Sequence, residues 1–267
     1  MKRLVSLLAL IPALVSPSAL PSEEVKLDAA PIDVRDIASL QAGARTFVNY
    51  CLSCHSASMM RYNRLHDLGL SDAQIKDNLL FAGDKIGDLM MVAMTRKDAK
   101  DWFGVAPPDL SVIARSRGAD WLYTYLRTFY RDPKAVSGWN NLAFPNVAMP
   151  HVLWTLSGQS VLDEREFKTE HEAEAAKLQS RAYSVIEESG EGAERRYLLK
   201  TTKLATAGSL TPVEYDAVAR DLVNFLVWMS EPNQVFRKQV GILVTLVLLV
   251  LLVLTYLLYK EFWKDVH

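Results

Sequence analysis

The chain has 267 residues, of which 50% are hydrophobic, and its 30 basic and 31 acidic side chains give a formal net charge of −1. This length provides enough material for one domain, or two small ones, with a sizeable core. The even charge balance argues against the strongly basic surface of a nucleic-acid-binding protein, so we expect no nucleic acid among the partners. Two cysteines are too few for a disulfide-stabilised scaffold.

The amino-terminal residues have the pattern of a secretory signal. Lys2 and Arg3 precede a short apolar stretch, Leu4 to Val15, which is followed by small and turn-forming residues. A basic start, a short apolar centre and a small-residue end are typical of a signal peptide. The stretch is also short for a helix that crosses a bilayer. We therefore predict a signal peptide over residues 1–20 and an extracytoplasmic domain over residues 21–234.

The first helix of this domain is predicted directly before the two cysteines. Gly43 lies within it, where the lack of a side chain would let another helix cross closely. Apolar residues recur there at the spacing of one helix face: Ile37, Leu40, Ala44, Phe47, Val48 and Cys51.

Cys51, Cys54 and His55 form a C-x-x-C-H motif, the attachment signature of c-type haem. Two thiols three positions apart on a helical turn can each form a thioether with one vinyl group of the porphyrin, and the adjacent histidine can bind the iron. A zinc site would need four ligands, and a thioredoxin-like dithiol would follow a βαβ pattern. A structural disulfide suits this tight spacing poorly. The motif therefore predicts one covalently bound haem c.

Helices and loops are predicted in the middle of the chain. Residues 71–80 begin with a helix-cap signal, and residues 120–130 place Trp121, Leu122, Tyr125, Leu126 and Phe129 on one inward face. Loops are predicted at residues 106–109 and 140–150. Residues 155–208 carry ten acidic and eight basic side chains with few aromatic residues. We interpret that stretch as a charged, solvated insertion, partly helical around residues 171–186.

The last helix of the domain has the clearest start signal. Thr211 and Glu214 have the spacing of a capping box, Pro212 suits the first helical position, and Pro232 ends the helix. Two amphipathic helices, one before the haem motif and one at the end of the domain, indicate an all-α haem domain. The apolar face of the last helix comprises Tyr215, Val218, Leu222, Phe225, Leu226 and Met229.

The residues from Val240 to Tyr259 form a run of twenty without a charge. A helix of that length crosses about 30 Å of hydrocarbon. Basic residues flank the run, and aromatic residues gather at its carboxyl end, as is typical of a membrane interface. We predict a transmembrane anchor and a short cytoplasmic tail over residues 235–267, with the exported domain on the other side of the membrane.

The second axial position of the haem iron has several candidate ligands. Met149 lies between Pro145 and Pro150, in an extended segment that can present a thioether without a helix blocking its approach. We favour Met149, and His151 and the Met90 to Met94 group remain alternatives; any single methionine is otherwise a core residue. The complete set of candidates is Met59, Met60, Met90, Met91, Met94, Met149, Met229, His66, His151 and His171.

Several runs, taken in order, resemble the cytochrome c1 family, in its proteobacterial form. The resemblance covers nearly the whole chain after the signal and is weakest over residues 155–208. The runs are Ala42-Gly43-Ala44-Arg45 before the haem motif, Ala106-Pro107-Pro108-Asp109-Leu110-Ser111, Ala114-Arg115-Ser116-Arg117, Phe144-Pro145-Asn146-Val147-Ala148-Met149-Pro150, and Asp221-Leu222-Val223-Asn224-Phe225-Leu226 with Glu231-Pro232.

The resemblance implies a cytochrome c-like domain with loop-rich insertions and one carboxyl-terminal transmembrane helix, held in the inner membrane with the haem on the periplasmic side. It implies a subunit of the ubiquinol–cytochrome c reductase (bc1) complex that carries electrons and is not an enzyme by itself. Its haem would accept electrons from the Rieske iron–sulfur protein and pass them to a soluble or membrane-bound cytochrome c. Cytochrome b, membrane lipid and a second copy within the dimeric complex would be further partners.

The resemblance also implies roles for single residues. Cys51 and Cys54 would bind the haem covalently, with His55 as the proximal and Met149 as the distal iron ligand. Arg117 and Trp121 would lie near a haem propionate, although a tyrosine is common at the position of Trp121.

Two other functional classes are consistent with parts of the pattern. A haem enzyme or gas sensor needs an open iron site and a polar distal group, for which His66 or His151 is available. A membrane-tethered dithiol oxidoreductase would use the two cysteines without haem.

Overall fold

The computed structural model describes residues 27–180, 183–190 and 195–265, so the predicted signal peptide lies outside the described residues. The helical elements of the described chain are α2 (Ile37–Thr46), η2 (Phe47–Cys51), η3 (Tyr62–Leu68), α3 (Asp72–Asn78), α4 (Arg96–Phe103), α5 (Ile113–Arg117), α6 (Ala119–Arg127), α7 (Trp154–Ser157), α8 (Glu170–Gln179), α9 (Pro212–Ser230) and α10 (Gln234–Phe262). The strands are β1 (Ala57–Arg61), β2 (Leu89–Met90), β3 (Phe129–Arg131), β4 (Trp139–Asn141), β5 (Gly158–Phe167), β6 (Val185–Ser189) and β7 (Arg196–Ala207).

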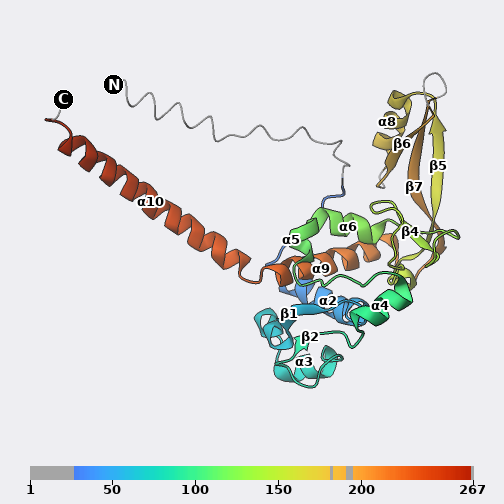
Figure 1. Cartoon of the computed structure of the whole chain (residues 1–267), viewed down its shortest axis with the longest axis horizontal. Coiled ribbons are helices and arrows are strands. Elements are labelled where there is room, and N and C mark those ends of the chain that lie inside the picture. The colour runs from blue at the N-terminus through green and yellow to red at the C-terminus, as the bar shows by residue number, and fades with distance from the viewer. Residues whose placement is uncertain (1–26, 181–182, 191–194, 266–267) are drawn as a thin grey trace.

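The helix before the haem motif, α2, packs closely against α9 (Figure 1). A Cβ atom at Gly43 would lie 2.0 Å from the carbonyl oxygen of Asp221, so the crossing requires glycine. Polar side chains bridge the two helices at this point, because Ser39 Oγ donates to the Asp221 carboxylate at 2.7 Å and accepts from Asn224 Nδ2 at 2.9 Å. The close helix crossing predicted from Gly43 is confirmed.

The predicted helix starts are confirmed by their caps. Thr211 and Glu214 form the complete capping box of α9, and Ser71 and Gln74 form one at α3. The helix predicted over residues 120–130 is shorter, because α6 ends at Arg127 and β3 follows. The Thr128 hydroxyl lies 2.9 Å from the carbonyl oxygen of Thr124 and 3.1 Å from Asn141 Oδ1, so it ties the end of the helix to β4.

The main hydrophobic core includes buried side chains from α2, α6 and α9. Cys51 belongs to this core, so the first cysteine of the haem motif is packed among the buried side chains of the domain. Other fully or nearly fully buried members are Leu40, Phe47, Leu122, Leu126, Leu222 and Phe225.

The prediction of an all-α domain is wrong, because five strands form a mixed sheet in the order β4-β3-β5-β7-β6. Strands β5 and β7 pair antiparallel from Gly158↔Ala207 to Phe167↔Tyr197, and β3 pairs with β5 in parallel. The part made of β5, β6 and β7 extends away from the helices, with α8 beside it (Figure 1). It lies within residues 155–208, for which the sequence predicts a charged, solvated insertion.

Several charges of residues 155–208 are paired across strands, so a charged sequence is compatible with a sheet here. Lys200 on β7 lies 2.6 Å from Glu187 on β6 and 3.7 Å from Glu164 on β5. Along β7, buried Tyr197 and Leu199 alternate with half-exposed residues, so one side of the strand is covered. The predicted helix is confirmed at α8, whereas residues 185 and 186 belong to β6.

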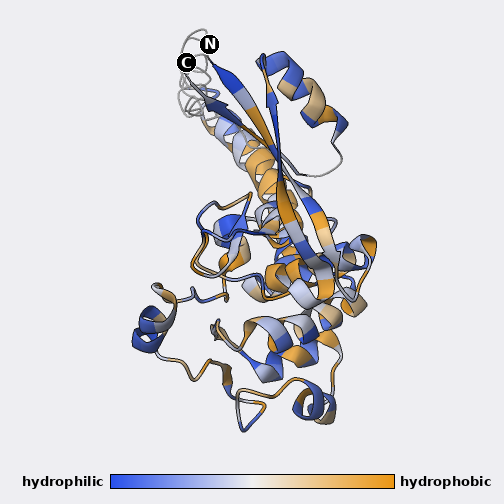
Figure 2. Ribbon diagram, turned by 90° about the vertical axis from the view of Figure 1, so that its right-hand side faces the viewer, coloured by the Kyte–Doolittle hydropathy of each residue, from blue (hydrophilic) through white to orange (hydrophobic). Residues whose placement is uncertain are grey.

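A single long helix, α10, projects from the domain beyond α9 (Figure 1). It has 29 residues with a mean hydropathy of 2.9 in its most apolar window and is, among the described residues, the one helix long and apolar enough to cross a membrane. Its hydrophobic character is visible along most of its length in Figure 2. Three residues separate it from α9. Glu231 in this connection pairs with Arg237 of α10 and lies 3.5 Å from Arg115 of α5.

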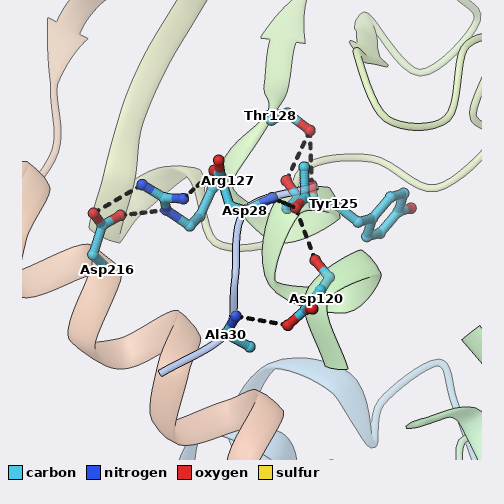
Figure 3. A network of polar contacts seen from close by, with 8 residues as sticks. Asp28, Ala30, Asp120, Tyr125, Arg127, Thr128 and Asp216 are labelled. Carbon is cyan, nitrogen blue, oxygen red and sulfur yellow. Dashed lines mark hydrogen bonds and ion pairs between the residues drawn. The ribbon is translucent and has the colours of Figure 1, made fainter. Parts of the chain in front are cut away.

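The beginning of the described chain is fastened to α6 and α9 by polar contacts (Figure 3). The Arg127 guanidinium lies 2.5 Å from the Asp28 carboxylate and 2.6 Å from that of Asp216. The amide of Ala30 donates to Asp120 at 2.8 Å. These contacts hold one side of α6, while the Tyr125 ring of the same helix points to the opposite side (Figure 3).

Candidate haem-binding site

The C-x-x-C-H motif curls into a turn at the end of η2. The carbonyl oxygen of Cys51 accepts the amides of Cys54 at 3.1 Å and His55 at 2.8 Å. Cys51 is buried and Cys54 half-buried, and both are free thiols. Burial, together with the neighbouring Cys54, raises the pKa of the Cys51 thiol to about 12. The turn therefore presents two free thiols and an imidazole within five residues.

The His55 ring is oriented by a backbone oxygen. Its Nδ1 lies 2.7 Å from the carbonyl oxygen of Pro108. Because a carbonyl only accepts hydrogen bonds, Nδ1 carries the proton and Nε2 keeps a free lone pair. Burial lowers the pKa of His55, although the Pro108 bond and the charge of Asp109 oppose this shift. A neutral imidazole with a fixed ring and a free Nε2 is suited to bind a metal ion.

The segment that carries Pro108 is itself fixed to the residues after the motif. The Asp109 carboxylate accepts the amides of Ser58 and Ser111, both at 2.8 Å. Burial opposes ionisation, but these hydrogen bonds outweigh it and hold the pKa of Asp109 below its usual range. The Ser111 hydroxyl in turn accepts the amide of Met59 at 3.0 Å. The acceptor for His55 is therefore part of a tightly connected loop.

Met149, Tyr125, Trp121 and Arg117 form a second group. The Tyr125 hydroxyl donates to Met149 Sδ at 3.4 Å. The Trp121 ring stacks on the Tyr125 ring with a centroid distance of 4.9 Å and an angle of 12°. The Arg117 guanidinium carbon lies 5.0 Å from the centre of the Trp121 ring. The structure thus brings together three of the six predicted site residues, and Tyr125 connects two of them.

Arg117 has an available positive charge. It is exposed, and its guanidinium lies over the rings of Trp121 and Phe144. Within the described ranges no carboxylate forms an ion pair with it, in contrast to Arg115, which lies near Glu231. A free guanidinium beside an aromatic surface is suited to pair with an anionic group such as a propionate.

Two asparagines fix the loop that leads to Met149. The Asn141 side chain is fully buried, and its Nδ2 donates to the carbonyl oxygen of Tyr125 at 2.8 Å. Its Oδ1 accepts the amide of Ala143 at 2.9 Å. Asn140 Oδ1 accepts the amide of Asn146, which adopts a left-handed conformation with φ of 61°. The loop and the helix that carries Tyr125 are therefore held together.

Two of the candidate histidine ligands, His151 and His66, are engaged in other hydrogen bonds. His151 is buried, its Nε2 is hydrogen-bonded to Ser157 Oγ at 2.7 Å, and burial lowers its pKa to about 4. Both ring nitrogens of His66 have polar partners. Nδ1 lies 2.8 Å from the carbonyl oxygen of Leu70, and Nε2 lies 2.9 Å from the Asp72 carboxylate. His171 lies on α8, outside the helical part of the domain.

The remaining candidate methionines differ from Met149 in their surroundings. Met60, Met90 and Met229 are buried in the core, whereas Met59 and Met91 are exposed. Met94 is half-buried, in the segment before α4. Among the described methionines, Met149 is the one whose sulfur accepts a hydrogen bond from another side chain.

The donor set fits haem c. Two free thiols suit two thioether bonds, the imidazole of His55 has a free Nε2, and the Met149 thioether is a soft neutral ligand. Against known families, the model described as "Cytochrome C1 family" matches residues 28–185 and 204–266. The chain belongs to the cytochrome c1 family.

The alignments with individual relatives cover almost the whole chain. The chain is 49% identical to the ammonia monooxygenase gamma subunit of Nitrosomonas europaea, over 92% of this chain and 91% of the relative. It is 46% identical to cytochrome c1 of Allochromatium vinosum, over 90% of both chains. It is 25% identical to cytochrome b/c1 of Bradyrhizobium diazoefficiens, over 90% of this chain and 35% of that longer protein.

Membership in the cytochrome c1 family confirms the cofactor that the C-x-x-C-H motif predicted and the function that the resemblance implied. The chain is a haem subunit of the bc1 complex, carries one covalently bound haem c, and has cytochrome b as a partner subunit. It transfers electrons within this complex and has one candidate membrane helix, α10.

Several residues that order the site were missed by sequence reasoning. Tyr125 was predicted only as an inward core residue, and its spacing of four from Trp121 was the available signal for a shared helix face. Asn140 and Asn141 were placed in a loop without a role. The Pro108 acceptor is a backbone atom, so its side-chain type carries no signal for the contact with His55.

Proposed function

We propose that Cys51 and Cys54 form the thioether bonds to haem c, that Nε2 of His55 binds its iron, and that Met149 Sδ binds the opposite face. The observation that carries this proposal is the hydrogen bond from His55 Nδ1 to the Pro108 carbonyl oxygen, because it leaves Nε2 as the free donor. Bound haem supplies one iron that alternates between ferrous and ferric states and so carries a single electron.

Arg117 and Trp121 are proposed to lie near a haem propionate. The exposed Arg117 guanidinium supports this role, since it is charged and has no acidic partner among the described residues. The indole N–H of Trp121 is a donor only, so it can serve an anionic acceptor in place of the tyrosine hydroxyl that the family resemblance led us to expect.

We further propose that this subunit takes electrons from the Rieske iron–sulfur protein and passes them to a soluble or membrane-bound cytochrome c. A thioether favours ferrous iron and raises the reduction potential. A high potential is what an acceptor needs when its donor is itself a comparatively high-potential Rieske centre. An open distal site, as in a gas sensor, is less well supported, because His66 and His151 are engaged in other hydrogen bonds.

The proposed location is the periplasmic side of the inner membrane, as part of a dimeric complex. The signal pattern over residues 1–20 and the apolar helix α10 support an exported domain, residues 21–234, with a single membrane anchor in contact with lipid, residues 235–267.

The deciding experiment replaces Met149 with leucine in the haem-loaded protein. Met149→Leu keeps the side-chain volume but removes the ligand, so the iron should become five-coordinate or take water, and the reduced protein should bind carbon monoxide. The potential should fall, and electron transfer from the Rieske protein should fail. The haem should stay attached through denaturation, because Cys51 and Cys54 are unchanged.

Met94→Leu is the matched control, since Met94 is also partly exposed and has no role in this proposal. Its spectrum and potential should remain those of the parent protein. A low-spin spectrum and an unchanged high potential in Met149→Leu would show that another residue is the distal ligand.

A further inference from the structure

The contact between the Tyr125 hydroxyl and the Met149 sulfur joins two parts of the chain that are far from each other in sequence. Tyr125 lies on α6, and Met149 follows in the loop after β4. The two atoms are 3.4 Å apart, within the range for a hydrogen bond to sulfur. A thioether has no hydrogen, so the hydroxyl must be the donor.

The hydroxyl is held in this direction by its surroundings. Tyr125 is 9% exposed, its ring stacks on that of Trp121, and it packs in a T-shaped arrangement with the Phe129 ring at a centroid distance of 4.9 Å. Asn141 holds the backbone of the same residue through the carbonyl oxygen.

We propose that Tyr125 is a positioning residue that raises the reduction potential of the haem iron by donating its hydrogen bond to Met149 Sδ. This inference rests on the proposed function, since it requires Met149 to be an iron ligand. In this proposal Tyr125 contacts the ligand Met149 but does not itself bind the iron.

The direction of the effect follows from the two lone pairs of a thioether sulfur. When one lone pair binds iron, the other is free to accept the Tyr125 hydroxyl. The hydrogen bond withdraws electron density from the sulfur and weakens its donation to iron, which costs the electron-poor ferric state more than the ferrous state. The positive end of the O–H dipole also points at the sulfur, and a positive potential near the iron disfavours the additional charge of the ferric state. Both effects raise the potential.

The partial burial of the contact strengthens both effects. Tyr125 is 9% exposed and its ring packs against Trp121 and Phe129, so the hydrogen bond lies in surroundings of lower dielectric constant than water, where it is electrostatically stronger. It also restrains the flexible methionine side chain, so the sulfur is held in place before the iron changes its oxidation state.

The test uses Tyr125→Phe in the full-length, haem-loaded protein. Phenylalanine keeps the ring that packs against Trp121 and Phe129 and removes only the hydroxyl, so the fold is retained. The midpoint potential is measured by redox titration, and the sulfur-to-iron charge-transfer band of the ferric protein reports whether Met149 is bound. We expect the band to remain and the potential to fall.

Tyr123→Phe is the matched control. Tyr123 lies two residues away on the same helix, is also buried, and has its ring against Arg127 rather than Met149. Removal of its hydroxyl should leave the potential unchanged. A fall of equal size in both variants would show a general loss of polarity and would overturn the proposal.

Two further outcomes separate this proposal from the assignment of the ligand. An unchanged or higher potential in Tyr125→Phe, with the band present, overturns the role of Tyr125 while Met149 remains the ligand; loss of the band likewise rejects a tuning role. Retention of the band in Met149→Leu rejects the ligand assignment itself. In the double variant the effect of Tyr125→Phe on the potential should disappear, because the acceptor is gone.

Discussion

At the scale of single residues, Asn141 connects parts of the site without being one of the proposed ligands. Its amide group donates to the carbonyl oxygen of Tyr125 and accepts the amides of Ala143 and Phe144. Its Oδ1 also meets the Thr128 hydroxyl at 3.1 Å. One fully buried side chain therefore joins the end of α6 to the loop that carries Met149.

We expect Asn141→Ala to be strongly destabilising. The substitution removes the buried hydrogen bond to the Tyr125 carbonyl oxygen and the acceptor of the Ala143 and Phe144 amides, and each hydrogen bond lost in a buried or partly buried setting costs about 1–3 kcal/mol. The free energy of unfolding should therefore fall by about 3 kcal/mol or more, as measured by denaturant titration of the detergent-solubilised protein. Asn49→Ala is the control, because Asn49 is exposed and its change should stay within about 0.5 kcal/mol. Equal effects of the two variants would contradict this role of Asn141.

The sequence predicts which side chains serve haem, but it does not predict which groups hold these side chains in place. Cys51, Cys54 and His55 are recognisable because their chemistry and spacing are local. The partner of His55 lies at Pro108, and the partner of Met149 at Tyr125. Such contacts depend on the tertiary fold and on backbone atoms, so residue types and their periodicity do not reveal them.

At the scale of elements, the helices were predictable and the sheet was not. The faces of α2 and α9 repeat with a helical period, and both helices carry start signals close in sequence. Strands β5, β6 and β7 are half-exposed and rich in charge, so they lack the clear alternation of a buried sheet. Several of their charges pair across strands, as that of Lys200 does with Glu164, and the sequence does not show such pairs.

The crossing of α2 and α9 gives the sharpest prediction at this scale. In Gly43→Ala the new Cβ would lie 2.0 Å from the Asp221 carbonyl oxygen and 2.7 Å from the Cβ of Phe225. Because backbone atoms are involved, the helices must move apart, at the upper end of the about 1–3 kcal/mol typical of overpacking. This exceeds the gain of about 1 kcal/mol in helix propensity. The melting temperature should fall in thermal unfolding.

The control for this substitution is Gly87→Ala. No atom lies within 4 Å of a Cβ at Gly87, and this residue is not in a left-handed conformation. Its melting temperature should match that of the parent. An unchanged melting temperature for Gly43→Ala would show that the two helices separate at little cost.

At the scale of the whole molecule, the domain and its anchor should be separable. Helix α10 has no buried residue, and its contact with the domain includes the exposed ion pair of Arg237 with Glu231. Such pairs contribute about 0–1 kcal/mol. A chain that ends at Gln234 should therefore remain soluble after export, keep its haem, and unfold within about 1 kcal/mol of the anchored form in denaturant titration. Aggregation of this fragment, or loss of its low-spin spectrum, would show that α10 takes part in the fold.

Only three residues connect α9 to α10, so the orientation of the membrane helix affects the orientation of the haem domain. Glu231 binds Arg237 on the membrane helix and lies near Arg115 on α5, so the connection is braced on both sides. The uncharged run from Val240 to Tyr259 matches a bilayer of about 30 Å. A thinner membrane would be met by a greater tilt of this helix. Because the connection has only three residues, we expect a change in tilt to change the orientation of the haem domain as well, so that lipid thickness would affect the angle at which the haem faces the other redox centres.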